Sequence, residues 1–208
     1  IYMIPNNIHF IFGLKEQTSE LMFVHYLAVL SAKIINKPDN IFFYYHYEPY
    51  GKWWNKLKTF VELIKVEIPT KWGNEPIKHY AHAADFIRMN ILFNRGGIYM
   101  DIDTITVNSY SKYLNNKFVM GRQTRPDGLC NAIMMSEPKS QFLKIWLSYY
   151  EKNFKSTPPG TKHWDLASIK LPYELSKKFK NLITILDPET FFIPNWDNCD
   201  MIFEKKMI

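Results

Sequence analysis

Two aspartates stand at the end of a short apolar run near the middle of the chain. Asp101 and Asp103, separated by one isoleucine, follow the β-type segment 98–100. In an extended segment, residues two apart lie on one side, so both carboxylates can face the same cleft. Two close acids repel each other unless a positive charge lies between them, and Mg²⁺ and Mn²⁺ prefer carboxylate oxygen. We therefore predict a divalent-cation site with Asp101 and Asp103 as ligands, Asp103 being the direct one. The alternative is that the pair only begins a turn after the strand.

An acid and a base lie one helical turn apart shortly before this motif. Asp85 and Arg88 belong to an apolar segment of helical period, residues 79–95, which ends at two glycines. Residues i and i+3 share one face of a helix, so the two side chains can reach the same pocket. The apolar residues around them favour a buried helix. The alternative is an ion pair on a solvated face, which contributes only about 0.2–0.5 kcal/mol.

Apolar patterning predicts alternating strands and helices in the first half of the chain. The order strand, helix, strand, helix, strand, helix, strand implies an α/β fold with a mostly parallel sheet and covering helices. Ligands of such sheets bind at the carboxyl ends of the strands, which is where Asp101 and Asp103 fall. The expected strands are 7–12, 41–47, 63–68 and 98–100, and the expected helices are 18–36, with Thr18 or Ser19 as its cap, 53–60 and 79–95. In the less regular second half we expect strands 117–121, 129–135 and 183–186, a helix over 140–150 and another ending near residue 179.

The composition indicates a globular chain. Its 208 residues, 47% of them hydrophobic, suit a single domain with a real core. The formal charge of +6 comes from scattered lysines rather than a basic stripe, so no nucleic-acid partner is expected. The longest apolar stretch, residues 21–35, is interrupted by His25 and Lys33 and is too short to span a bilayer. We recognise no signal peptide, and Cys130 and Cys199 have no disulfide-framework or metal-site spacing, which favours a reducing compartment.

The two motifs together carry a resemblance. The pattern Ala84-Asp85-Phe-Ile-Arg88, followed after eight residues by Gly97-Ile-Tyr-Met-Asp101-Ile-Asp103, resembles glycosyltransferases whose sugar-binding region contains a DXD motif. That group includes yeast-type α-mannosyltransferases, α-1,4-galactosyltransferases and clostridial glucosylating toxins, and the chain is also similar to capsid glycosyltransferase domains of large DNA viruses. The resemblance implies the GT-A fold, which is Rossmann-like. It also implies one catalytic domain over residues 1–208, with a nucleotide-binding half over 1–107 and an acceptor-side half over 108–208.

The resemblance assigns roles to individual residues. Asp85 and Arg88 would hold the donor sugar's hydroxyls and the phosphate side of the leaving group, and Asp101 would serve both sugar or ribose hydroxyls and the metal. Asn131 would face the sugar, although a structural hydrogen bond to a neighbouring loop is the alternative. The catalytic set is thus Asp85, Arg88, Asp101 and Asn131. The third metal ligand would be one of His163, Asp165 or Asp197.

The first strand would contribute the platform for the base. His9 and Phe10 match a His-Phe pair of the family, and the aromatic residue two positions after that pair stacks on uracil. Relatives often carry Trp there, whereas this chain carries Phe12, which can stack but has no indole donor. The alternative for Phe12 is an ordinary core position. With Asp85, Arg88 and Asp101, these three residues complete the predicted donor-binding set.

The function that the resemblance implies is metal-dependent glycosyl transfer. It would use Mn²⁺ or Mg²⁺ and a UDP-sugar rather than a GDP-sugar, and would transfer a hexose to a glycan or protein-linked glycan with retention of configuration. We expect a monomer or a part of a longer multidomain chain. Its expected place is the cytoplasm, that of a host if the source is viral, or the Golgi lumen if an anchor lies outside this fragment.

Two other functions remain open from the sequence. A phosphohydrolase of the haloacid-dehalogenase type also carries Asp-x-Asp at a strand end, with the first Asp as nucleophile and the second as acid. The late position of the motif and its Gly-Gly lead-in favour the transferases. The second alternative is a nucleotide-sugar-binding module without turnover.

Overall fold

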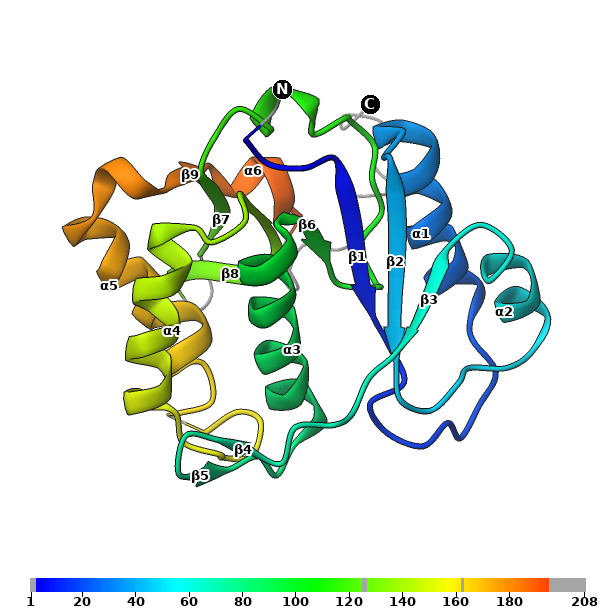
Figure 1. Ribbon diagram of the computed structural model, residues 1–208, viewed down its shortest axis with the longest axis horizontal. Coiled ribbons are helices and arrows are strands. Elements are labelled where there is room, and N and C mark those ends of the chain that lie inside the picture. The colour runs from blue at the N-terminus through cyan, green and yellow to red at the C-terminus, as the bar shows by residue number, and fades with distance from the viewer. Residues whose placement is uncertain (1–2, 125–126, 162, 195–208) are drawn as a thin grey trace.

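The computed structural model describes residues 3–124, 127–161 and 163–194. Within these ranges a seven-stranded sheet forms the centre of the molecule, in the order β3-β2-β1-β6-β8-β7-β9 (Figure 1). Its strands are β1 (Asn7–Ile11), β2 (Asn40–Tyr45), β3 (Glu62–Lys65), β6 (Gly97–Met100), β7 (Phe118–Thr124), β8 (Asp127–Ser136) and β9 (Thr184–Leu186). The helices are α1 (Phe23–Asn36), α2 (Lys52–Leu57), α3 (Tyr80–Arg95), α4 (Gln141–Asn153), α5 (Leu171–Lys178) and α6 (Pro188–Phe191). A two-stranded hairpin, β4 (Lys71–Trp72) with β5 (Glu75–Pro76), precedes α3, and a π-helical turn, Leu166–Lys170, precedes α5.

The sheet is mostly parallel, which confirms the predicted fold class. Strand β1 pairs in parallel with β2 on one side and β6 on the other, and β3 continues the parallel order beyond β2. Strand β8 runs antiparallel to both β6 and β7, and β9 returns parallel to β7. Strand β8 has ten residues and β6 has four, so β8 extends past the carboxyl end of β6. Strand β7 pairs with β8 beyond that end, after a register shift between Met120 and Gly121. A β8–β7 ribbon therefore overhangs the carboxyl end of β6.

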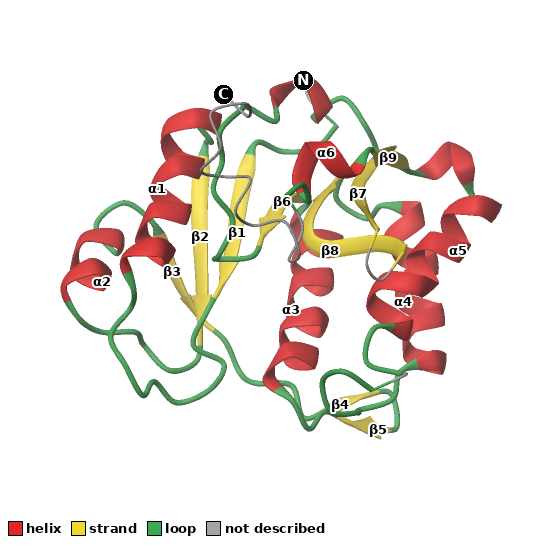
Figure 2. Ribbon diagram, turned by 180° about the vertical axis from the view of Figure 1, so that it is seen from behind, coloured by secondary structure: helices red, strands yellow, loops and turns green. Residues whose placement is uncertain are grey.

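Side chains alternate across the sheet into two cores. On β2, Phe42 and Tyr44 enter the core that α3 and α4 cover, whereas Ile41 and Phe43 enter the core that α1 and α2 cover. Figure 1 and Figure 2 show these helix pairs from opposite sides of the molecule. The alternation follows from the period of two in a strand. It places Tyr99 of β6 on the α3 side.

Several predicted bounds are wrong. Helix α1 begins at Phe23, with the extended Met22 as its cap position, and neither Thr18 nor Ser19 caps it. The chain is not helical just before α1, where the Leu21 amide donates to the distant Tyr50 carbonyl at 3.0 Å. Helix α2 ends at Leu57 and β3 at Lys65, both earlier than expected, and the β4–β5 hairpin was not predicted.

Candidate active site

A two-glycine turn brings helix α3 back against β6. Gly96 and Gly97 follow the helix with φ of +66° and +102°, values that side chains rarely adopt. A Cβ on Gly97 would lie 2.7 Å from the Asn7 carbonyl oxygen and 2.7 Å from His9 Nε2. The close approach packs α3 beside the strand that follows it. The turn thereby sets Asp85 and Arg88 next to the end of β6.

Arg88 is the centre of a buried polar network. Its Nη1 lies 3.2 Å from Asp101 Oδ1, its Nε lies 3.6 Å from Asp85 Oδ1, and its guanidinium stacks over the Tyr99 ring at 4.5 Å. The Tyr99 hydroxyl donates to the same Asp101 oxygen at 2.6 Å. Burial opposes a charge on Arg88, but the carboxylate of Asp101, together with Tyr99 and Asp85, raises the pKa of the guanidinium above its ordinary value. The predicted Asp85–Arg88 pair is therefore a buried one, and the solvated alternative is excluded.

Asn131 links this network to strand β8. Its Nδ2 donates to Asp85 Oδ1 at 2.7 Å, while its backbone oxygen and Oδ1 accept from Arg88 Nη1 at 2.9 and 3.3 Å. The hydroxyl of Tyr150, on α4, donates to the other oxygen of Asp85 at 3.0 Å. The structure thus brings together all four residues of the predicted catalytic set, Asp85, Arg88, Asp101 and Asn131.

Asp101 and Asp103 face one cavity, but the backbone that presents them is not the extended segment that their spacing predicted. Strand β6 ends at Met100, and Asp101 begins a turn in which its carbonyl accepts from the Thr104 amide at 3.2 Å and hydroxyl at 2.7 Å. Asp103 is exposed and Asp101 is partly buried. Burial raises the pKa of Asp101, and the charge of Arg88 opposes that rise. A turn rather than an extended segment therefore presents both carboxylates.

The cavity has a volume of about 770 Å³ and opens where β6 ends. Asp101, Asp103 and Asn131 lie on its wall, whereas Asp85 and Arg88, each 7% exposed, lie behind it. The overhanging β8–β7 ribbon forms one side, and Gly160, Thr161, Trp164 and Asp165 with α6 form the other. The further lining residues are Thr104, Gln123, Thr124, Cys130, Ala132, Gly160, Thr161, Trp164, Asp165, Ile169, Phe191, Phe192 and Pro194. Its position agrees with the rule that ligands bind at the carboxyl ends of the strands.

The predicted third metal ligand has no clear counterpart. His163 is exposed and is not a lining residue. Asp165 lines the cavity, but one of its oxygens lies 3.4 Å from Lys170 Nζ. Asp197 lies outside the described residues. Within the described ranges no group of three or more His, Cys, Asp or Glu side chains is arranged to hold a metal ion.

Two of the residues predicted to bind the nucleotide, His9 and Phe10, are core residues, and their side chains do not line the cavity. His9 is completely buried, with Nε2 2.9 Å from the Gly96 carbonyl oxygen and Nδ1 3.2 Å from the Tyr44 hydroxyl. Phe10 is also completely buried, in the core beneath α1 and α2. Phe12 is partly buried, with its ring 5.0 Å from that of His25, and it is not a lining residue of the cavity.

Some residues of the site were not predicted. Tyr99 lies two residues before Asp101 on the α3 side of the sheet, so strand alternation could have identified it. No local signal marks Tyr150, which reaches Asp85 across 65 positions of sequence. Trp164, by contrast, belongs to the segment 163–165 considered for closing the site; it is on the cavity wall, with its ring 4.5 Å from that of His82, a buried residue of α3.

Comparison with known proteins agrees with this geometry. Residues 13–120 match the family described as the glycosyltransferase sugar-binding region containing a DXD motif. The chain belongs to this family. Asp101 and Asp103, the Asp-x-Asp of this DXD family, lie within the matched residues. The predicted class, a glycosyltransferase, is confirmed at the level of family, and the phosphohydrolase alternative is not supported.

Individual members and structures resemble the chain over most of its length. Glucan organizing enzyme 1 of Cryptococcus neoformans is 34% identical over 93% of the chain, and the chain spans 55% of that protein's length. The PaToxG glycosyltransferase has a TM-score of 0.60 at 18% identity, covering 85% of this chain and 70% of that one. The UDP-bound glycosyltransferase domain of the YGT toxin has a TM-score of 0.57 at 10% identity, covering 88% and 79%. These likenesses show the fold, which is of the GT-A type, as predicted. Within the described residues, no helix combines the length and apolarity needed to cross a bilayer.

Proposed function

We propose that this DXD-family chain transfers a hexose from a UDP-sugar to a glycan acceptor with the help of Mn²⁺ or Mg²⁺. The observation that carries the proposal is the pair Asp101 and Asp103 on the wall of one cavity, with Arg88 behind them at the end of a central strand. The UDP-bound toxin domain of the same fold supports a uridine nucleotide as the carrier.

The carboxylates on the wall fit a hard divalent cation. Asp101 commits Oδ1 to Tyr99 and Arg88, whereas within the described chain neither its Oδ2 nor the oxygens of Asp103 have a hydrogen-bond or ion-pair partner. Three free carboxylate oxygens suit Mg²⁺ or Mn²⁺, which tolerate few protein ligands when water and phosphates complete the shell. A cation held there would neutralise the charge that develops on the departing diphosphate.

The buried network orients the groups that face the donor. Arg88 and Tyr99 fix the Asp101 carboxylate from behind, which leaves its second oxygen directed away from them. Asp85 fixes the amide of Asn131 through Nδ2, so the amide is held on the wall where a sugar would lie. We assign Asp85 and Arg88 to the donor site through these two lining residues. Such fixed polar groups stabilise a transition state because they need not reorganise when charge develops.

Retention of configuration forms part of the proposal. Inversion needs a general base at the acceptor hydroxyl, and the acids among the described lining residues are Asp101, Asp103 and Asp165. The first two are assigned to the cation and the third pairs with Lys170. This set supports transfer with retention. Residues 1–107 would provide the nucleotide-binding half and residues 108–208 the acceptor-side half.

The test is donor binding and hydrolysis with and without Mn²⁺. UDP-glucose, UDP-galactose, UDP-N-acetylglucosamine and GDP-mannose are compared by shift in Tm and by release of nucleoside diphosphate. We expect a UDP-sugar to raise Tm and to be hydrolysed only when Mn²⁺ is present. Asp103→Ala should lose both responses, whereas Asp127→Ala, which removes an exposed acid outside the cavity, should keep them. Equal responses of the unmodified chain and Asp103→Ala to every donor would refute the site.

A further inference from the structure

Helix α1 is apolar on the side that faces away from the sheet. Its buried residues, Ala28, Val29, Ala32 and Asn36, point toward the sheet. Phe23, Leu27, Leu30 and Ile34, spaced i, i+4, i+7 and i+11, form the opposite stripe, here called the α1 face. Phe23 is 51% and Ile34 58% exposed, and the two leucines are partly exposed. A surface helix normally carries polar residues on that side, so the α1 face is exceptional.

A second helix of similar length in the same chain shows the contrast. Helix α4 directs polar and charged residues outward, and Tyr149 is its exposed large apolar residue. In α1, Lys33 is the one charged side chain apart from the titratable His25. The outward polarity of α4 is what solvent exposure requires. The apolar stripe of α1 indicates a face that is covered when the protein works.

Neighbouring segments extend the apolar area. Met22 and Val24, at the start of the helix, are 55% and 40% exposed. The loop beside α1 is held by a hydrogen bond from the Thr106 amide to Ser31 Oγ at 3.0 Å, and it exposes Ile105 and Val107 on either side of that contact. Figure 2 shows α1 on the outside of the sheet, with α2 beside it. These residues add exposed apolar side chains at the start of the helix and on the loop that contacts it.

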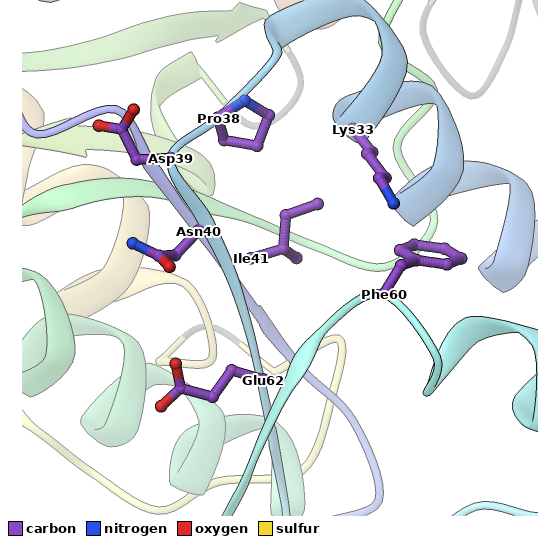
Figure 3. Close-up of a pocket in the computed structure, with 7 residues that line it drawn as sticks. All are labelled: Lys33, Pro38, Asp39, Asn40, Ile41, Phe60 and Glu62. Carbon is purple, nitrogen blue, oxygen red and sulfur yellow. The ribbon is translucent and has the colours of Figure 1, made fainter.

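A rim of aromatic rings and lysines, here called the lysine–aromatic rim, borders the face on the α2 side. Trp53 packs against Phe23 and Tyr26 at 4.7 and 5.2 Å. Further rim contacts place the ammonium groups of Lys52 and Lys56 5.0 and 5.1 Å from the Trp53 ring, and that of Lys33 4.4 Å from the Phe60 ring. Figure 3 shows Lys33 and Phe60 together on one side of a shallow hollow and the acids Asp39 and Glu62 on the other.

We propose that the α1 face, with its lysine–aromatic rim, docks on the surface of a bilayer that contains anionic phospholipid. Phe and Leu side chains would enter the boundary between headgroups and acyl chains, as in helices that lie in the plane of an interface. Trp and Tyr rings are favoured at that level, and lysines beside them attract anionic headgroups. The cationic rim distinguishes this occupant from a neutral protein surface. A 14-residue helix is too short to span, so it lies on the membrane rather than in it.

The experiment is sedimentation with lipid vesicles. The intact 208-residue chain is mixed with vesicles of pure phosphatidylcholine and with vesicles containing about 30% phosphatidylserine, at low and high salt. We expect binding to the anionic vesicles at low salt and its loss at high salt, because exposed charges are screened. No binding to the anionic vesicles, or equal binding to both kinds, would overturn the proposal.

Two variants and a control locate the surface. Lys52→Gln with Lys56→Gln should weaken partitioning roughly thirtyfold, because each lysine near an anionic surface contributes about fivefold. Phe23→Ser with Ile34→Ser should weaken it at least about tenfold. Tyr149→Ser, at a similarly exposed position on α4, should bind as the unmodified chain does, and circular dichroism confirms that each variant is folded. Sedimentation velocity tests the other occupant. If the unmodified chain is a dimer and the double variant Phe23→Ser with Ile34→Ser is a monomer, the α1 face binds a second copy of the chain and the membrane proposal is wrong.

Discussion

The guanidinium of Arg88 lies 3.2 Å from the carboxylate of Asp101, and the two side chains are only 8% and 32% exposed. Arg122 and Asp127 form a second pair at 3.1 Å, but with side chains 46% and 52% exposed. The distances are nearly equal, so the surroundings decide what each pair contributes. Water and salt screen the outer pair, whereas the inner pair cannot be broken without leaving an uncompensated charge in the core.

We expect Arg88→Met to lower the free energy of unfolding by about 3–5 kcal/mol, because Asp85 would remain buried, and Asp101 partly buried, without their cation. Urea unfolding measures the change. Arg122→Met is the matched control, and its unfolding midpoint should stay within error of the unmodified chain. Similar losses for the two variants would show that the Arg88 network does not hold the site.

The hydroxyl of Tyr99 should matter for both stability and catalysis. Tyr99→Phe removes the 2.6 Å hydrogen bond to Asp101 while keeping the ring that packs against Arg88. Because the acceptor is charged, we expect a loss of about 1.5–3 kcal/mol in unfolding free energy. Donor hydrolysis should also slow, since Asp101 loses a group that orients it. Tyr149→Phe removes an exposed hydroxyl and should change neither quantity; unchanged hydrolysis in Tyr99→Phe would argue against the orienting role.

The two-glycine turn after α3 should be sensitive to an added side chain. At Gly97 an alanine Cβ would meet both the Asn7 carbonyl oxygen and His9 Nε2 at 2.7 Å, with φ at +102°. We expect Gly97→Ala to lower stability by about 3 kcal/mol or more, from backbone strain and overpacking together. At Gly160, φ is +78° but nothing lies within 4 Å of the added carbon. Gly160→Ala should therefore lose only about 1 kcal/mol, and thermal unfolding of both variants distinguishes the two costs.

Stability should fall as the pH is lowered below neutrality, partly because of His9. Burial lowers the pKa of His9 from 6.5 to about 4, against a smaller opposing effect of its hydrogen bond to Gly96. Between these values the unfolded chain binds a proton that the folded chain does not, so the folded state is lost as pH falls through this range. At pH 4 the free energy of unfolding is lower by about 3 kcal/mol than at neutral pH because of His9 alone.

The contribution of His9 is isolated by comparing, between variants, how steeply the free energy of unfolding depends on pH. Burial also lowers the pKa of His25, His79 and His82, which act in the same direction. His9→Asn should therefore flatten the dependence of unfolding free energy on pH between about 6.5 and 4 without abolishing it. An unchanged slope in His9→Asn would contradict the assignment.

Local sequence patterns predicted the strands and helices that carry the site, because the residues that mark each of these elements are close together in sequence. Strand and helix periodicity located every element from β1 to β6 except the short β4–β5 hairpin. The i, i+3 relation of Asp85 and Arg88 placed both on the inner face of α3. Helix α1 was extended too far because Thr18 and Ser19 look like caps, and the sequence does not show the long-range bond from Leu21 to Tyr50.

Contacts between segments that are far apart in sequence could not be predicted from local patterns. Strand β1 is buried on both faces of the sheet, so its sequence did not show that His9 and Phe10 point into the two cores rather than toward a ligand. Tyr150 reaches Asp85 from a helix that no motif connects to α3. Asn131 was selected by resemblance, and its links to Asp85 and Arg88 emerge only when β8 is paired with β6.

The overhang of β8 past β6 gives the cavity two sides of different kinds. One is the β8–β7 ribbon, which carries Asn131 where its register shifts; the other is formed by Gly160, Thr161, Trp164 and Asp165 with the short α6. Exchanges at Gly160 and Thr161 can reshape the space for a sugar while the ribbon keeps its hydrogen bonds. Laboratory evolution toward a new donor should therefore begin with these two residues, which are exposed, line the cavity and belong to no helix or strand.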